Sequence, residues 1–407
     1  MTTRLQTLEG FYQNHIQPYY QNAHQAQQQG KPVAYVASTF PVEILQAMNI
    51  TPIWPENYAS VCAARQVSVR LAEIAERHDY SRDLCSYARA TIGSILTKEK
   101  DILPEGGMPK PTFLVASTAA CDTHLKWFQV LSHHLKRPLF LLDIPYNSSG
   151  ADAENLPKHL IQHYISQLEE LIPFLEKQTD TRLDKNKLRK AITLSNRTSN
   201  LWLEIQDYRK HIPTPMGARD AFSAVFFMLC IPATQTAIDF YEKLRDELKE
   251  RTKNDIGKIL NERYRLIWDN LPMWFNLKFF NYLNSLGAVT VAETFSHVWT
   301  GSLNPQKPLE SLAKKYLPNF ANCGIERRID LILNLAKDFH ANGIILPTNW
   351  GCRMMSIGET IVKEEIYKKL GVPSLILDVD SSDWRNYDET QVKRKVEGFI
   401  EILSRKD

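Results

Sequence analysis

The first α/β unit of the chain reads Pro32-Val33-Ala34-Tyr35-Val36, continues as Ser38-Thr39-Phe40-Pro41, and leads into an apolar stretch with helical spacing over residues 42–48. This pattern predicts a strand, a loop and a helix. The pattern recurs along the first part of the chain, with further strands expected at 51–54, 113–116 and 139–144 and helices at 59–77 and 123–135. Strands that alternate with helices predict a mainly parallel sheet.

After residue 156 the pattern changes to long amphipathic helices, and it returns to strands at 289–291, 343–346 and 374–377, with helices at 326–342 and 355–370. The fold class expected from this order is α/β, with two Rossmann-like (flavodoxin-like) domains that have mainly parallel sheets and are joined by a helical region. The expected division is an N-terminal helical arm over 1–30, a first α/β domain over 31–156, a helical region over 157–280 and a second α/β domain over 281–407.

Polar or reactive side chains stand at or just after the carboxyl ends of the four strands expected in the first domain, and they are Ser38, Glu56, Cys121 and Asp143. The carboxyl ends of parallel strands share one edge of the sheet, where ligands bind in this class of fold. We therefore expect these four residues at one edge, and a functional site in the cleft between the two domains.

The charge balance gives no reason to expect an anionic partner. Lysine and arginine total 49 against 46 acidic residues, a formal charge of +3, so neither nucleic acid nor a membrane is expected. No apolar run is long enough to span a bilayer, and the N-terminal thirty residues lack the basic start and apolar stretch of a signal peptide. The chain is expected in the cytoplasm.

Six cysteines are too few for a disulfide scaffold, and none forms a Cys-x-x-Cys pair. Cys85, Cys121 and Cys352 each stand where a helix is expected to begin, and the free amides and positive dipole of a helix start stabilise thiolates. Thiolates from distant loops can meet in a cleft and hold an iron–sulfur cluster. The alternative, that these are ordinary buried thiols, stays open on spacing alone.

The other three cysteines have different surroundings. Cys62 and Cys230 lie within apolar stretches and are expected in the core. Cys323, in Asn322-Cys323-Gly324, stands just before an expected helix and is not assigned to the core.

Several motifs together resemble one family in their order and separation over roughly residues 30–400. They are Ser38-Thr39-Phe40-Pro41, Pro55-Glu56-Asn57, Asp83-Leu84-Cys85-Ser86-Tyr87-Ala88-Arg89, Cys121 with Lys126-Trp127, Asp143-Ile144-Pro145-Tyr146-Asn147 and Gly351-Cys352-Arg353. The chain resembles the 2-hydroxyacyl-CoA dehydratase family, which also contains the subunits of the ATP-dependent benzoyl-CoA reductases. Within it, the chain is most similar to the larger, substrate-activating type of dehydratase subunit.

The resemblance implies one 4Fe-4S cluster per chain, held by Cys85, Cys121 and Cys352, with one iron open. It implies an acyl-CoA substrate, a second homologous subunit in a heterodimer or a homodimer, and a separate iron–sulfur activator protein that alone binds and hydrolyses ATP. The activator would inject one low-potential electron, and a (R)-2-hydroxyacyl-CoA would then lose water through a ketyl radical. On the same basis Cys323 could approach a cluster or supply the open iron's fourth ligand.

The resemblance also implies catalytic roles for two further residues. Ser38 matches a serine near the substrate oxygen, and Glu56 matches a glutamate that faces the same cavity. Each has a structural alternative, since Ser38 could cap the following helix and Glu56 could form an ion pair with Arg89.

Two motifs depart from the family pattern, at Asn349-Trp350-Gly351-Cys352-Arg353 and at Asp380-Ser381-Ser382-Asp383-Trp384-Arg385. These departures leave the acyl group open. Two alternative functions also remain: a reductase of the benzoyl-CoA type or of the type with a double-cubane cluster, and a non-catalytic electron-transfer subunit. Ligation by Cys323 would favour a reductase of either type.

Overall fold

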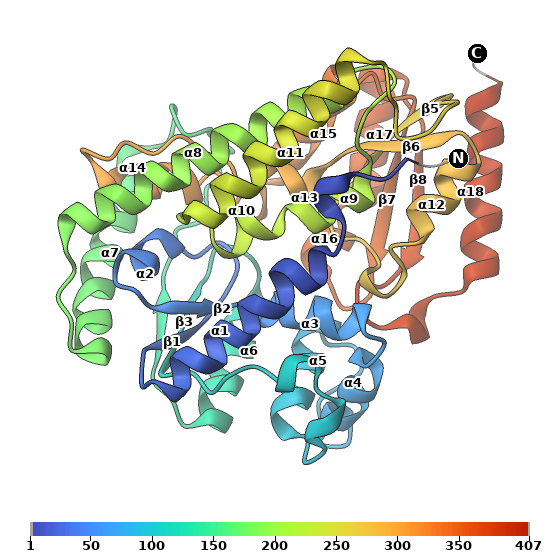
Figure 1. Ribbon diagram of the computed structural model, residues 1–407. Coiled ribbons are helices and arrows are strands. Elements are labelled where there is room, and N and C mark those ends of the chain that lie inside the picture. The colour runs from blue at the N-terminus through green and yellow to red at the C-terminus, as the bar shows by residue number, and fades with distance from the viewer. Residues whose placement is uncertain (1–2, 406–407) are drawn as a thin grey trace.

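The computed structural model describes residues 3–405 and contains two parallel sheets, each with four strands (Figure 1). The first has the order β2-β1-β3-β4 and the second the order β6-β5-β7-β8. Their bounds are β1 Val33–Val36, β2 Thr51–Ile53, β3 Phe113–Ser117, β4 Leu139–Leu142, β5 Tyr264–Trp268, β6 Ala288–Glu293, β7 Gly343–Asn349 and β8 Ser374–Val379. The expected fold class, with two Rossmann-like α/β domains, is confirmed.

The α-helices are α1 Gln17–Gln28, α2 Val42–Ala47, α3 Pro55–Ala64, α4 Ser68–Glu76, α5 Ser86–Leu96, α6 Asp122–Leu135, α7 Lys158–Thr179, α8 Lys185–Arg209, α9 Ala218–Ala224, α10 Phe226–Cys230, α11 Gln235–Lys253, α12 Phe279–Ser285, α13 Thr294–His297, α14 Pro308–Tyr316, α15 Ile325–Asp338, α16 Arg353–Ser356, α17 Glu359–Leu370 and α18 Glu389–Ser404. Short 3-10 or π turns are η1 Gln6–Leu8, η2 Tyr12–Ile16, η3 Lys100–Ile102, η4 Pro104–Gly106, η5 Trp274–Asn276, η6 Phe320–Asn322 and η7 Trp384–Asn386. No helix within residues 3–405 combines the length and the apolar character needed to cross a bilayer.

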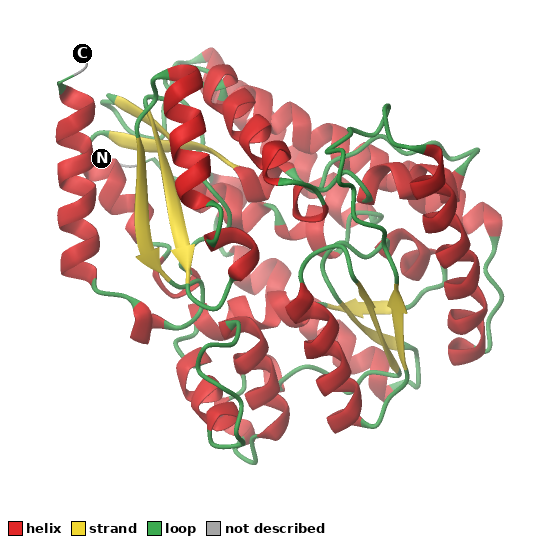
Figure 2. Cartoon of the chain, turned by 180° about the vertical axis from the view of Figure 1, so that it is seen from behind, coloured by secondary structure: helices red, strands yellow, loops and turns green. Residues whose placement is uncertain are grey.

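The strands form where short apolar runs can be buried on both faces. Every residue of β1, β3, β5 and β6 is buried, as is typical of parallel strands covered by helices on both sides. The apolar core of the first domain continues into α7, α8 and α11, so the long helices pack on that domain. Figure 2 shows the two sheets on opposite sides of the molecule with helices between them.

Strand β5 was not expected, because residues 264–268 lie in the stretch predicted to be helical. Arg265 stands in the middle of Tyr-Arg-Leu-Ile-Trp and interrupts the apolar pattern. It is nevertheless buried, because its guanidinium donates to the carbonyl oxygens of Phe339 and His211 and pairs with Glu262. With these partners satisfied, β5 lies between β6 and β7 in the second sheet.

Two expected helices are each divided in two. The stretch expected as one helix over 59–77 forms α3 and α4, because Gln66 takes a left-handed conformation with φ 59° and ends the first helix. The stretch over 355–370 likewise forms the end of α16 and then α17. The expected strand over 139–144 ends at Leu142.

A fully buried ion pair joins the helical region to the second sheet. Arg209, at the end of α8, donates to both carboxylate oxygens of Glu293, at the end of β6, over 2.6 and 2.9 Å. Both side chains have 0% exposure. The Ser296 hydroxyl also donates to Glu293 over 2.9 Å, so the charges are paired and hydrogen-bonded.

Removing one partner of this pair is expected to destabilise the protein strongly. An Arg209→Ala variant leaves the Glu293 carboxylate buried without its cation, which costs about 3–5 kcal/mol. The free energy of unfolding from urea titration measures this loss. The matched control is Arg197→Ala, on the same helix, whose pair with Glu242 is about half exposed and is worth at most about 1 kcal/mol. Equal losses of unfolding free energy in the two variants would contradict the conclusion that the buried Arg209–Glu293 pair stabilises the fold.

Candidate functional site

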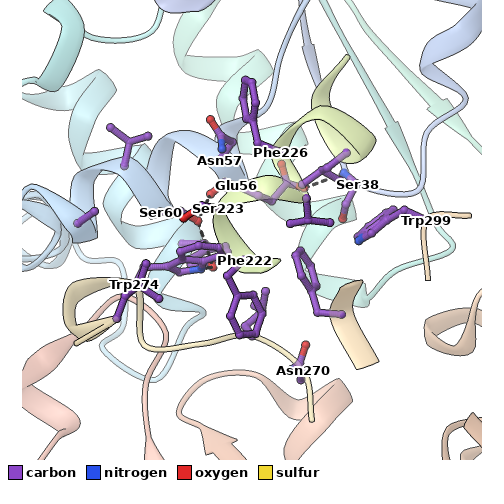
Figure 3. Close-up of a pocket in the computed structure, with 18 of the residues that line it drawn as sticks. Ser38, Glu56, Asn57, Ser60, Phe222, Ser223, Phe226, Asn270, Trp274 and Trp299 are labelled. Carbon is purple, nitrogen blue, oxygen red and sulfur yellow. Dashed lines mark hydrogen bonds between the residues drawn. The ribbon is translucent and has the colours of Figure 1, made fainter. Parts of the chain in front are cut away.

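A cavity of about 960 Å³ lies where the two domains, the N-terminal arm and the α9–α10 segment meet. It is lined at the carboxyl ends of strands from both sheets, which is where ligands bind in this class of fold. Its polar and sulfur-bearing walls include Ser38, Thr39, Glu56, Cys85, Cys121, His124, Asn270 and Cys352, and its apolar walls include Phe222, Phe226, Trp274, Phe295 and Trp299. Figure 3 shows Ser38 and Glu56 on one side of this space and Asn270 on another.

The structure brings the three predicted cysteines to this cavity, and each is the N-cap residue of a helix. Cys85 precedes α5, Cys121 precedes α6 and Cys352 precedes α16. Backbone amides of the first turn favour the ionised form of each thiol and act to lower its pKa; they belong to Tyr87 and Ala88 for Cys85, to Thr123 and His124 for Cys121, and to Met355 for Cys352. These amides stabilise a thiolate at each position.

A glycine lets the cysteine loops of the two domains approach each other. Gly351 has φ +69°, and a Cβ added there would lie 2.8 Å from the carbonyl oxygen of Leu84. Leu84 immediately precedes Cys85, and Gly351 immediately precedes Cys352. Only a glycine accommodates both the left-handed conformation and this contact.

The three thiols differ in acidity. Burial, with a smaller contribution from a neighbouring cysteine, raises the pKa of Cys85 to about 11 and that of Cys352 to about 12. Burial opposes ionisation of Cys121 as well, but the adjacent His124 imidazolium outweighs it and lowers the pKa of that thiol. The pKa of His124 is raised well above its ordinary value, because Cys121 and Glu56 favour its charge more than burial opposes it.

The donor set of the cavity fits an iron–sulfur cluster. Three thiols that lie close enough for their charges to interact line the cavity, and thiolates are the ligands that such clusters take. Within residues 3–405, no three Cys, His, Asp or Glu side chains are spaced to hold a single metal ion. The ligands of a cluster bind different irons and therefore lie farther apart than the donors to one ion.

Glu56 connects the ends of three strands. Its Oε1 atom accepts the backbone N–H of Ser38 over 2.8 Å and lies 3.0 Å from His124 Nε2. Its Oε2 atom is buried and has no hydrogen-bond partner among the described residues. Glu56 therefore presents a free acceptor in the wall of the cavity, and it does not pair with Arg89, which binds Glu76 and Asp383 instead.

Ser38 lies beside Glu56 and does not cap the following helix. Helix α2 begins after Pro41 and has no side-chain cap. The next residue, Thr39, takes a left-handed conformation with φ 66° and is buried. A β-branched residue is strained there, and its hydroxyl hydrogen-bonds to that of Ser117 over 2.7 Å. The loop after β1 is thus held in a fixed shape against β3.

Other predicted residues lie elsewhere. Cys323 is buried outside the cavity wall and accepts a hydrogen bond from Asn147 Nδ2 over 3.4 Å. Cys62 and Cys230 are in the core, as expected. Asp143 points outward and lies 3.5 Å from His163, with 69% of its side chain exposed.

Thr39, His124 and Asn270 are among the lining residues that were not expected at the site from the sequence. The spacing Cys121-x-x-His124 could have predicted that His124 lies beside Cys121, because residues three apart share one face of a helix. Asn270 follows β5 and could not be placed without that strand.

The fold and the cavity define a two-domain α/β enzyme whose site is lined by cysteines from both domains. The family described as 2-hydroxyglutaryl-CoA dehydratase, D-component, matches residues 37–403, and the chain belongs to this family. It is therefore a dehydratase-like enzyme, with a reductase as the alternative.

Curated relatives cover almost the whole chain. It is 27% identical to the (R)-phenyllactyl-CoA dehydratase alpha subunit of Clostridium sporogenes, over 93% of this chain and 91% of that one. It is 26% identical to the (R)-2-hydroxyisocaproyl-CoA dehydratase alpha subunit of Clostridioides difficile, over 94% and 93%. It is also 27% identical to a subunit of the benzoyl-CoA reductase of Thauera aromatica, over 89% and 87%.

The difference in acidity among the three thiols is expected to appear as selective alkylation. In iron-free protein at pH 7.5, iodoacetamide should modify Cys121 at least about tenfold faster than Cys85 or Cys352, because one pKa unit changes the thiolate fraction tenfold. Peptide mass spectrometry measures the three rates. A His124→Ala change should slow Cys121, whereas His133→Ala, at an exposed site on the same helix, should not. Equal alkylation rates at all three cysteines in the unaltered chain would contradict the interaction between His124 and Cys121.

Proposed function

We propose that the chain is the iron–sulfur subunit of a cytoplasmic, radical (R)-2-hydroxyacyl-CoA dehydratase. The observation that carries this proposal is the convergence of Cys85, Cys121 and Cys352, from both domains, on a cavity that also contains Ser38 and Glu56. The three thiolates would hold one 4Fe-4S cluster, which supplies single-electron chemistry when bound. The first-turn amides at each cysteine would stabilise the negative charge of the bound thiolates.

The protein side chains would position the substrate and move its protons. The free Oε2 atom of Glu56 can accept a hydrogen bond or a proton from an acyl-CoA in the cavity. His124 and the Ser38 amide hold the other carboxylate oxygen and so fix the direction of that acceptor. The Ser38 hydroxyl would donate a proton in the same cavity, and an acyl group bound against the aromatic walls would displace water.

The proposal includes partners that the relatives support. The matched dehydratases are named as alpha subunits, which favours a second, homologous subunit for this chain. An ATP-hydrolysing iron–sulfur activator would deliver the electron, and ATP would bind to that protein alone.

A reductase is the second candidate, because the benzoyl-CoA reductase relative is about as similar to this chain as the dehydratase subunits are. The aromatic lining of the cavity is compatible with an aromatic acyl group. The position of Cys323 outside the cavity wall favours a single cluster over a double-cubane cluster.

Iron content tests the cluster. Anaerobically purified protein is expected to hold roughly four irons and four sulfides per chain. Each of Cys85→Ala, Cys121→Ala and Cys352→Ala should lose the iron and the associated paramagnetic resonance signal. The controls Cys323→Ala and Cys62→Ala should retain both. Roughly eight irons would favour the double-cubane type, and absence of iron from the unaltered protein would overturn the proposal.

Turnover separates the two reactions. With the partner subunit, an activator and ATP, the protein is expected to convert a 2-hydroxyacyl-CoA into the 2-enoyl-CoA with release of water. Ser38→Ala and Glu56→Gln should lower kcat by about 10²–10⁴-fold, as expected for lost proton transfer, while iron content stays unchanged. Reduction of an aromatic acyl-CoA without dehydration would favour the reductase. Unchanged kcat in both variants would make the chain an electron-transfer subunit.

A further inference from the structure

Asn270 carries a buried amide donor that has nothing to bind within the described part of the protein. It follows β5 and lines the cavity, and Figure 3 shows its side-chain amide at the edge of that space. The residue is 6% exposed, and its Nδ2 atom has no hydrogen-bond partner among the described residues. Buried polar groups are almost always paired in native proteins, so an unpaired donor in a cavity wall indicates a ligand acceptor.

The backbone of Asn270 is fixed in an unusual conformation. Its φ of 68° is left-handed, a conformation that asparagine tolerates better than most residues. Its N–H donates to Thr294 Oγ1 over 2.7 Å, and that hydroxyl donates to Asp269 Oδ1 over 2.6 Å. Arg328 pairs with the other oxygen of Asp269 over 2.9 Å, and all these groups are buried.

This network fixes the backbone that carries the Asn270 side chain before any ligand arrives. The charge of Asp269 is neutralised by Arg328, the Thr294 hydroxyl donates to Asp269 and accepts the Asn270 N–H, and neither side chain binds the Nδ2 atom. A side chain on a fixed backbone loses less freedom when it binds, which increases affinity.

The surroundings of Asn270 select the kind of acceptor. Phe222, Phe295 and Trp274 also line the cavity and offer no acceptor side chain. Two buried cations that line the cavity are already paired, Lys258 with Asp220 and His124 with Glu56. Neither is therefore free to act as the counter-ion of a negatively charged acyl group. A neutral carbonyl oxygen fits the donor and the apolar walls.

We propose that Asn270 donates a hydrogen bond to a carbonyl oxygen of the bound acyl-CoA and that it is the second domain's contribution to substrate recognition. The inference rests on the proposed function, since it takes acyl-CoA as the ligand. Acyl-CoA offers two sources of such an oxygen, the thioester and the amides of the pantetheine arm. Both have the neutral acceptor that the donor requires.

The test is calorimetric binding to the anaerobically purified protein, with Asn270→Gly as the main variant. Glycine removes the amide and accepts the left-handed backbone without strain. The control is Asn49→Gly, which makes the same change at an exposed asparagine that has φ 54° and does not line the cavity. The ligands are a 2-hydroxyacyl-CoA and an S-alkyl-CoA, in which a methylene group replaces the thioester carbonyl.

Asn270→Gly is expected to bind the acyl-CoA about tenfold more weakly, while Asn49→Gly binds it normally. Loss of affinity for the acyl-CoA alone would identify the thioester oxygen, and equal loss for both ligands would identify a pantetheine amide. Asn270→Asp, which keeps the shape but replaces the donor with an acceptor, should show a similar or larger loss and serves if the glycine variant does not fold. Normal acyl-CoA binding by a folded Asn270 variant would overturn the inference. Failure of the unaltered protein to bind any acyl-CoA would instead overturn the proposed function.

Discussion

The contact between Gly351 and the carbonyl oxygen of Leu84 is the constraint on which the site depends. It joins a loop of the second domain to a loop of the first, one residue before Cys352 and one residue before Cys85. A side chain at position 351 would have to displace backbone atoms, because an added Cβ would lie 2.8 Å from that oxygen and 3.0 Å from the Cys85 nitrogen. Thiols from segments far apart in sequence therefore meet only if the two domains pack in this arrangement.

The buried ionic groups maintain that packing. The Arg209–Glu293 pair ties the long helices to the second sheet, and the Arg328–Asp269 pair fixes the end of β5 beside the cavity. Buried pairs of this kind are costly to break, so they favour one arrangement of the elements. The cavity is thus shaped by structural residues that never touch its contents.

Much of the fold could be predicted from apolar periodicity, because strands such as β1 and β3 are short apolar runs that the folded chain buries completely. Strand β5 could not, because Arg265 breaks the run and its partners come from loops distant in sequence. The same physical reason hid Asn270. A residue whose position depends on long-range hydrogen bonds leaves no local pattern.

The candidate site likewise contains residues that the sequence could predict and contacts that it could not. Cys85, Cys121 and Cys352 could be predicted as site residues because each stands where a helix begins. The start of a helix is a local property of the sequence. The contacts of Glu56 with His124 and with the Ser38 amide arise only from the parallel order of the strands.

The central claim is that the three cysteines hold one cluster in the cavity between the domains. Diffraction from anaerobically grown crystals, recorded at the iron absorption edge, tests it most directly. The account predicts a single anomalous peak within bonding distance of the sulfur atoms of Cys85, Cys121 and Cys352, on the wall beside Ser38 and Glu56. A peak centred on Cys323, or no iron signal from crystals that retain all six cysteines, would contradict it.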